Sequence, residues 1–183
     1  MNESNDYDRL LVPITERERI RGSINAPVKL LEYGDYQCFD CGQLHRTLQA
    51  IEQQLNESFC FAFRHFPQTQ IHPQAQKAAE AAEAAAAQEK FWQMHDTLFE
   101  HQHALEDSHL VEYANNLELD IPQFLRDLSE HTYVNRINED IESGRNNNVI
   151  STPTLFINGD RYFGAWDLES LLTVVLKAGR NNV

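Results

Sequence analysis

The chain has 183 residues, of which 42% are hydrophobic and 10% aromatic, enough for one domain or a small domain with a large insertion. Lysine and arginine number 15 against 28 aspartate and glutamate residues, and the formal net charge is -13. This balance argues against nucleic acid and anionic membranes as main partners, because both require positive surface. No stretch approaches the ~20 apolar residues that cross a bilayer.

The N-terminus is acidic and polar, and it has neither the basic nor the apolar region of a secretory signal. We therefore expect residues 1–9 to form a disordered tail and the protein to act in the cytoplasm. Residues 10–14 are expected to add an edge strand, because Pro13 suits an edge and not a centre. The three cysteines are too few for a disulfide-stapled scaffold. In a reducing cytosol, a close pair is more often catalytic, redox-sensing or metal-binding.

A Cys-x-x-Cys pair lies where a predicted strand ends and a predicted helix begins. Residues 28–31 form an apolar run that reads as a short buried strand. The helix after the pair carries apolar residues at spacings of three and four, namely Leu44, Leu48, Ile51 and Leu55. Backbone N–H groups and the dipole at a helix start stabilise a thiolate. We expect Cys38 to attack disulfides and Cys41, one turn further, to resolve the mixed disulfide.

The aromatic residues 59–66 predict a second buried strand, which ends at Pro67. Within it, Cys60 is expected to fill the core, because free cysteine is among the most buried residue types. The first strand, the helix and this strand predict a βαβ unit with parallel strands.

Residues from about 71 to 144 have helical character throughout. The alanine-rich run 78–87 has the highest helix propensity available. Shorter helices follow. Asp107 or Ser108 is the predicted N-cap of the first, and Asp120 is the predicted N-cap of the next. Gly144 is predicted to lie just after the end of the last helix.

After residue 144 the chain becomes extended again. Asn158-Gly159 separates two short strands and predicts a tight hairpin turn. Asp167 is the predicted cap of a final helix. The layout is therefore βαβ, a helical insertion and ββα, an α/β fold in which residues 10–70 and 145–183 form one domain and residues 71–144 an inserted helical subdomain.

This layout, with Cys-x-x-Cys at the first strand–helix junction and Thr-Pro before the hairpin, resembles the thioredoxin superfamily. The helical insertion resembles the DsbA-like thiol oxidoreductases in particular. The resemblance runs from about residue 10 to the C-terminus, and it rests on residues 32–42, 64–67, 91–92 and 151–159. It implies a thioredoxin fold and thiol–disulfide exchange on protein or peptide substrates. No external cofactor or metal is expected, and glutathione or a thioredoxin system is the expected redox partner.

The resemblance also implies roles for single residues. Cys38 matches the exposed nucleophile and Cys41 the buried resolving thiol. Glu32 matches a buried acid that moves protons to and from the resolving cysteine, and burial on a strand should raise its pKa. Pro153 matches a cis-proline that faces the cysteines, where the backbone of Thr152 pairs with an extended substrate.

The residues between the cysteines depart from the DsbA pattern. Phe39 and Asp40, which we also expect to contact the substrate, stand where strongly oxidising members have proline and histidine. An aspartate beside a thiolate destabilises it, so the reduction potential should be lower than in a strong oxidant. Together with the N-terminal composition, this favours a cytoplasmic reductase or thiol–disulfide exchanger.

Three alternatives stay open. A zinc site could use Cys38, Cys41 and His45, with Asp40 or His65 as a fourth ligand. A redox-inert, chaperone-like module could use the fold to bind peptides. A glutathione-dependent isomerase or transferase could use the same scaffold, although such enzymes typically lack the second cysteine.

Overall fold

The computed structural model describes residues 9–55 and 58–180. Within these ranges, five strands form one mixed sheet in the order β1-β3-β2-β4-β5. The strands are β1 (Arg19–Gly22), β2 (Val28–Gly34), β3 (Phe59–His65), β4 (Thr154–Ile157) and β5 (Asp160–Tyr162). The helices are α1 (Phe39–Leu55), α2 (Ala75–Ala86), α3 (Phe91–Glu100), α4 (Asp107–Asn116), α5 (Ile121–Ser129), α6 (Val134–Asn146) and α7 (Leu168–Arg180). The α/β fold class is confirmed. One further strand, β1, precedes the predicted βαβ unit along the chain.

The centre of the sheet is the predicted βαβ unit. β2 and β3 are parallel along their whole length, from Val28 opposite Phe59 to Gly34 opposite His65. β4 lies on the other side of β2 and runs antiparallel to it, with Tyr33 opposite Thr154. Because of this direction, the segment that leads into β4 lies at the end of β2 from which α1 departs.

The hairpin between β4 and β5 follows the predicted turn. Asn158 and Gly159 both have positive φ angles, 51° and 89°. A two-residue turn of this kind matches the twist of the strands it joins, and glycine and asparagine tolerate its backbone best. The amide of Asn158 also donates to the carbonyl oxygen of Lys29 at 2.8 Å, which ties the turn to β2.

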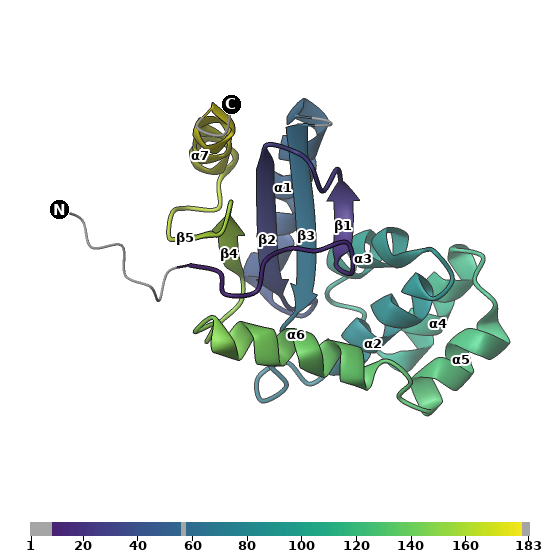
Figure 1. Cartoon of the computed structure of the whole chain (residues 1–183). Helices are drawn as coiled ribbons and strands as arrows, with labels where there is room; N and C mark the ends of the chain where they lie inside the picture. Colours follow the sequence, from purple (N-terminus) through teal and green to yellow (C-terminus); the bar gives the residue numbers. More distant parts are fainter. Residues whose placement is uncertain (1–8, 56–57, 181–183) are drawn as a thin grey trace.

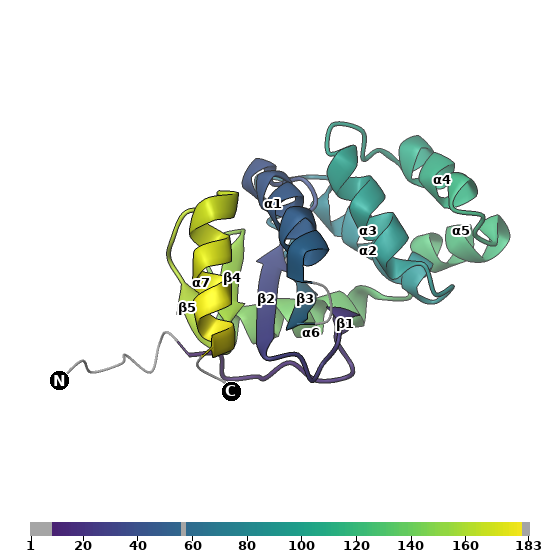
Figure 2. The same cartoon turned by 90° about the horizontal axis from the view of Figure 1, so that it is seen from above.

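Helices cover both faces of the sheet (Figures 1 and 2). α1 and α7 pack side by side on one face, and α1 buries Leu44, Leu48 and Ile51 as predicted. The other face is covered by α6 and the N-terminal segment. Its smaller core contains Leu31, Tyr33, Ala62, Val149 and Phe156. Since β2 and β3 are buried on both faces, their residues form nearly continuous apolar runs rather than an alternating pattern.

Helices α2 to α5 form a group beside β1, and α6 returns from it along the lower end of the sheet (Figure 1). Asp120 caps α5 as predicted, because its Oδ1 accepts from the Gln123 amide at 2.8 Å. The caps predicted for α4 are wrong, since Glu106 holds the N-cap position and makes no side-chain cap. Gly144 does not end α6 either. It lies inside the helix, where a Cβ would come within 2.7 Å of the Phe66 ring, so its small size lets α6 approach the sheet.

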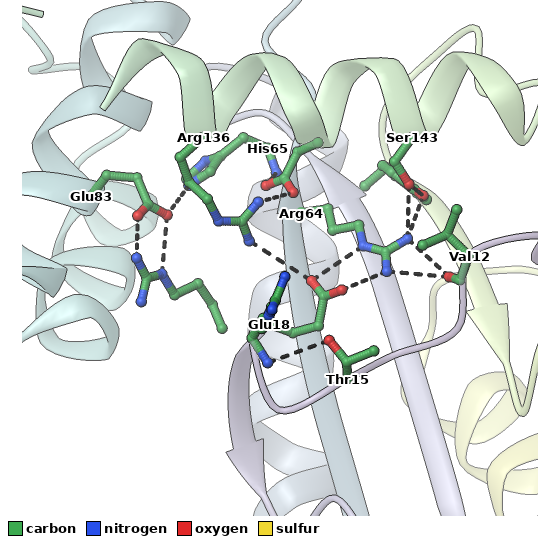
Figure 3. A network of polar contacts seen from close by, with 12 residues as sticks. Val12, Thr15, Glu18, Arg64, His65, Glu83, Arg136 and Ser143 are labelled. Carbon is green, nitrogen blue, oxygen red and sulfur yellow. Dashed lines mark hydrogen bonds and ion pairs between the residues drawn. The ribbon is translucent and has the colours of Figure 1, made fainter. Parts of the chain in front are cut away.

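The predicted edge strand at residues 10–14 is also wrong. The edge strand is β1, which pairs antiparallel with β3. The carbonyl groups of Val12 and Pro13 instead accept hydrogen bonds from the Arg64 guanidinium, at 3.2 and 3.3 Å. Arg64 also pairs with Glu18 at 2.6 Å (Figure 3). This buried arginine of β3 therefore holds the N-terminal segment in an irregular path across the sheet.

Residues 1–8 of the predicted tail lie outside the described residues, and Arg9 forms an isolated bridge with Asp160. The division into a domain of residues 10–70 and 145–183 with an insertion at 71–144 stays a prediction. Among the helices of residues 9–55 and 58–180, none combines the length and apolar character of a membrane span.

Candidate active site

The sheet topology brings Cys38 next to the loop before β4. Cys38 directly precedes α1, and its Sγ donates to the carbonyl oxygen of Thr152 at 3.3 Å. The peptide bond between Thr152 and Pro153 is cis. The two segments are 114 residues apart in sequence. They meet because β4 starts where β2 ends, so the structure brings together the two regions that the sequence analysis assigned to one site.

The surroundings of Cys38 favour its thiolate. The pKa of Cys38 is lowered from 9.0 to about 6, chiefly by a hydrogen bond from the Cys41 thiol, which outweighs the opposing effect of burial. Thr152 and the backbone N–H groups of Cys41 and Asp40 lower the pKa further. These N–H groups belong to the first turn of α1, as expected for an anion at a helix start.

Cys41 and Glu32 are more deeply buried than Cys38, and the pKa of each is raised rather than lowered. Burial raises the pKa of the Cys41 thiol well above 9.0, and its hydrogen bond to Cys38 adds to the shift. Burial also raises the pKa of Glu32 to about 8, although a hydrogen bond with Cys41 partly offsets this. Glu32 Oε1 has no hydrogen-bond partner among the described residues. In its ionised form, this carboxyl can accept the proton of the Cys41 thiol to which it is hydrogen-bonded.

Of the predicted substrate contacts, Thr152 and Pro153 are buried, whereas Phe39 and Asp40 lie on the surface. Phe39 is 69% exposed, and Asp40 is exposed next to it. Ile150, two residues before Thr152, is 82% exposed. Apolar side chains this exposed beside a reactive thiol are suited to contact another chain. The lower reduction potential expected from Asp40 stays a prediction.

Gln102, in the connection between α3 and α4, is a site residue that sequence reasoning missed. Its Nε2 donates to the carbonyl oxygens of Tyr36 at 2.9 Å and Cys38 at 2.7 Å. A Cβ on Gly42 would come within 2.0 Å of Gln102 Oε1, so glycine leaves the space that this side chain occupies. Nothing in the local sequence signals a contact across more than 60 residues.

A second missed residue is Asp35, whose buried carboxylate organises the loop before Cys38. It accepts from the amides of Gln37 at 2.7 Å and Gln68 at 2.8 Å, and it pairs with His72 at 2.8 Å. Gln68 in turn accepts from the Thr152 hydroxyl at 3.2 Å. Asp35 thus connects the cysteine loop to the loop before β4. Its place three residues before Cys38 was the only sequence signal for it.

The zinc site considered on Cys38, Cys41 and His45 does not form in the structure. His45 stacks on Phe99 and its Nε2 lies 3.7 Å from an oxygen of Asp96. His65, the other candidate ligand, pairs with Glu83 at 2.9 Å. The group of described residues that could hold a metal contains His45 but neither cysteine. Cys60 is fully buried, as expected of a core residue.

Comparison with known proteins supports the same fold. A family model described as thioredoxin matches residues 15–177. BdbD from Bacillus subtilis in its oxidised form has a TM-score of 0.79, at 21% identity over 89% of this chain and 93% of its own. The alpha-DsbA1 protein of Wolbachia pipientis has a TM-score of 0.81, at 21% identity over 94% of this chain and 96% of its own.

Curated relatives with higher identity have a different name. The Na(+)/H(+) antiporter NhaA 3 of Salinispora tropica is 40% identical over 92% of this chain, and an NhaA 1 of a Mycobacterium species is 41% identical over 90%. These matches cover 26% and 27% of the relatives, so the chain spans about a quarter of their length. The chain therefore shares the fold of BdbD and alpha-DsbA1, and the family match over residues 15–177 shows that it belongs to the thioredoxin family.

Proposed function

We propose that this protein catalyses thiol–disulfide exchange through a mixed disulfide on Cys38. The observation that carries the proposal is Cys38 at the start of α1, where its surroundings lower its pKa and the loop before β4 lies against its sulfur. In the reductive direction, the Cys38 thiolate attacks one sulfur of a substrate disulfide, and the other sulfur leaves as a thiolate. Cys41 then attacks the mixed disulfide, which releases the second substrate thiol and leaves a Cys38–Cys41 disulfide.

The second step needs a proton acceptor, because Cys41 must lose its proton to attack. Glu32 is the nearest candidate base, since it hydrogen-bonds with Cys41 and its pKa of about 8 is set mainly by burial. In this proposal the Glu32 carboxylate takes the Cys41 proton, and the resulting carboxylic acid returns it when the pair is reduced again. The substrate chain lies along the backbone of Thr152 and Pro153, with Phe39, Asp40 and Ile150 beside it.

We further propose that the protein acts as a reductase or exchanger in the cytoplasm, with glutathione or a thioredoxin system as its redox partner. A Cys38 pKa of about 6 supports a moderate potential, because it is closer to the value of about 7 in thioredoxin than to about 3.5 in DsbA. Ion transport is not part of the proposal, since the match to the antiporters covers only about a quarter of their length.

The test is an equilibrium titration of the Cys38–Cys41 pair against glutathione, followed by trapping. A potential near that of thioredoxin supports the reductase role, and one near that of DsbA contradicts it. Cys38→Ser should abolish turnover, whereas Cys41→Ser should accumulate mixed disulfides. Full turnover in Cys38→Ser would contradict the proposed mechanism. Unchanged client binding by the inactive double serine variant would favour the redox-inert, peptide-binding alternative.

A further inference from the structure

A second cluster of chemically capable side chains lies between α1 and α3. His45 comes from α1, and His95 and Asp96 come from α3. One ligand atom from each residue lies within 4.8 Å of the others. His45 Nε2 lies 3.7 Å from Asp96 Oδ1. This cluster has no part in the exchange reaction proposed for the cysteines.

Both imidazoles have a buried nitrogen that no described residue satisfies. His95 is fully buried and His45 is 4% exposed. The Nε2 atoms of both are among the few buried side-chain atoms without a hydrogen-bond partner in the described ranges. An unsatisfied buried polar atom costs about 1–3 kcal/mol. Two of them in one cluster therefore call for a ligand that both nitrogens can bind.

The protonation and orientation of the rings suit a metal. Burial lowers the pKa of His45 to about 4 and that of His95 well below its usual 6.5, so both rings are neutral at pH 7. His95 Nδ1 lies 3.0 Å from the Tyr36 hydroxyl. If Nδ1 carries the proton, this bond orients the ring and leaves a free lone pair on Nε2, as outer partners do for metal-binding histidines.

The nearby charges decide which metals fit. Arg21 donates to both oxygens of Asp96, at 2.8 and 2.7 Å, and its charge opposes a cation. Arg46 adds to this opposition, whereas the Glu52 carboxylate, 3.2 Å from Arg21, offsets it. A weakly directional oxygen-seeking ion such as calcium or magnesium has too few oxygen ligands here. Zinc and related transition metals bind imidazole directly and accept two histidines with one carboxylate.

We propose that His45, His95 and Asp96 bind a divalent transition metal of the zinc class. In a tetrahedral zinc site the ligand atoms lie about 3.4 Å apart, so small side-chain rotations must bring the three atoms closer. The metal would link α1, which carries the cysteines, to α3 of the helical group.

The test uses the full chain without a histidine tag and with Cys38→Ser and Cys41→Ser, so that the active-site thiols cannot compete for metal. The chain is stripped with a chelator and titrated with Zn²⁺ against a chromophoric competitor, and Co²⁺ absorption reports the coordination. We expect one Zn²⁺ per chain. His45→Gln and Asp96→Asn should each weaken binding by about tenfold or more.

The control is His103→Gln, which removes an exposed histidine outside the cluster. It should leave the affinity unchanged. Because replacement of a core histidine can unfold the chain, circular dichroism accompanies every titration. Asp96 is 30% exposed and provides the variant least dependent on core packing. The proposal is overturned if the parent takes up no stoichiometric Zn²⁺, or if folded Asp96→Asn binds it as tightly as the control does.

Discussion

At the scale of single residues, the two cysteines differ because their surroundings differ. Cys38 stands at the open end of α1, where N–H groups and the Cys41 thiol favour its charge, whereas Cys41 is fully buried. The hydrogen bond between the two thiols is the largest cause of the lowered pKa of Cys38. The same bond also raises the pKa of Cys41, for which burial is the main cause. Hydrogen bonding and burial thus separate the two pKa values, as the proposed mechanism requires of an attacking and a resolving sulfur.

The Cys41 thiol is the largest cause of the low Cys38 pKa, so removing it should raise that pKa from about 6 toward 9. The measurement is the pH dependence of Cys38 alkylation by iodoacetamide, followed by peptide mapping. Cys41→Ala should show the shift. Cys41→Ser keeps an O–H donor and serves as the matched control, with a smaller shift expected. An unchanged midpoint in Cys41→Ala would show that the helix start alone sets the pKa.

At the scale of elements, the connection between α3 and α4 controls the start of α1. Gln102 holds the carbonyl groups of Tyr36 and Cys38, and Gly42 leaves room for it. The helical group thus contributes a side chain to the geometry of the cysteine loop, in addition to packing against the sheet.

We expect Gln102→Ala to lower the free energy of unfolding by about 2 kcal/mol, because two hydrogen bonds of about 1 kcal/mol each are lost. It should also slow exchange with a disulfide peptide several-fold, since the Cys38 loop is no longer held. Gln88→Ala is the control, because Gln88 makes two comparable bonds to the backbone of Asp120 far from the cysteines. Equal exchange rates in both variants, at equal loss of stability, would leave Gln102 a purely structural role.

At the scale of the whole molecule, the buried acid of the site opposes folding stability at high pH. Glu32 has a pKa raised from 4.5 to about 8, mainly by burial. Its contribution to stability is therefore complete below pH 4.5 and is lost as the pH rises through 8. The contribution of Cys38 to folding stability has the opposite pH dependence. Its lowered pKa adds stability that is lost as the pH falls through 6.

Glu32→Gln should remove this pH dependence. Between pH 5 and 8, the variant should gain about 3 to 4 kcal/mol of unfolding free energy relative to its parent. Urea unfolding in a Cys38→Ser background measures the difference without the opposing thiol titration. Glu112→Gln, which removes the same charge from an exposed position of α4, should show no such gain. A parallel pH profile for Glu32→Gln and its parent would contradict the raised pKa.

The sequence predicted the parts of this fold that depend on local patterns. Apolar periodicity located α1, and Asn158-Gly159 located the hairpin. It missed β1, whose four residues are mostly polar and only partly buried. It also misjudged Gly144, since the reason for that glycine is the Phe66 ring across the helix–sheet interface. Asp35 and Gln102 escaped for the same reason, because their partners are distant in sequence and no local pattern encodes them.

The contact between Cys38 and Thr152 has a consequence for biosynthesis. At a synthesis rate of about 5–20 residues per second, the ribosome needs about 6–23 s to add the 114 residues that separate them. Both cysteines emerge from the ribosome before β4 does. The loop that will face them has not yet been synthesised at that time. The nascent thiols therefore meet the surrounding redox buffer before the finished protein can select its own reaction partners.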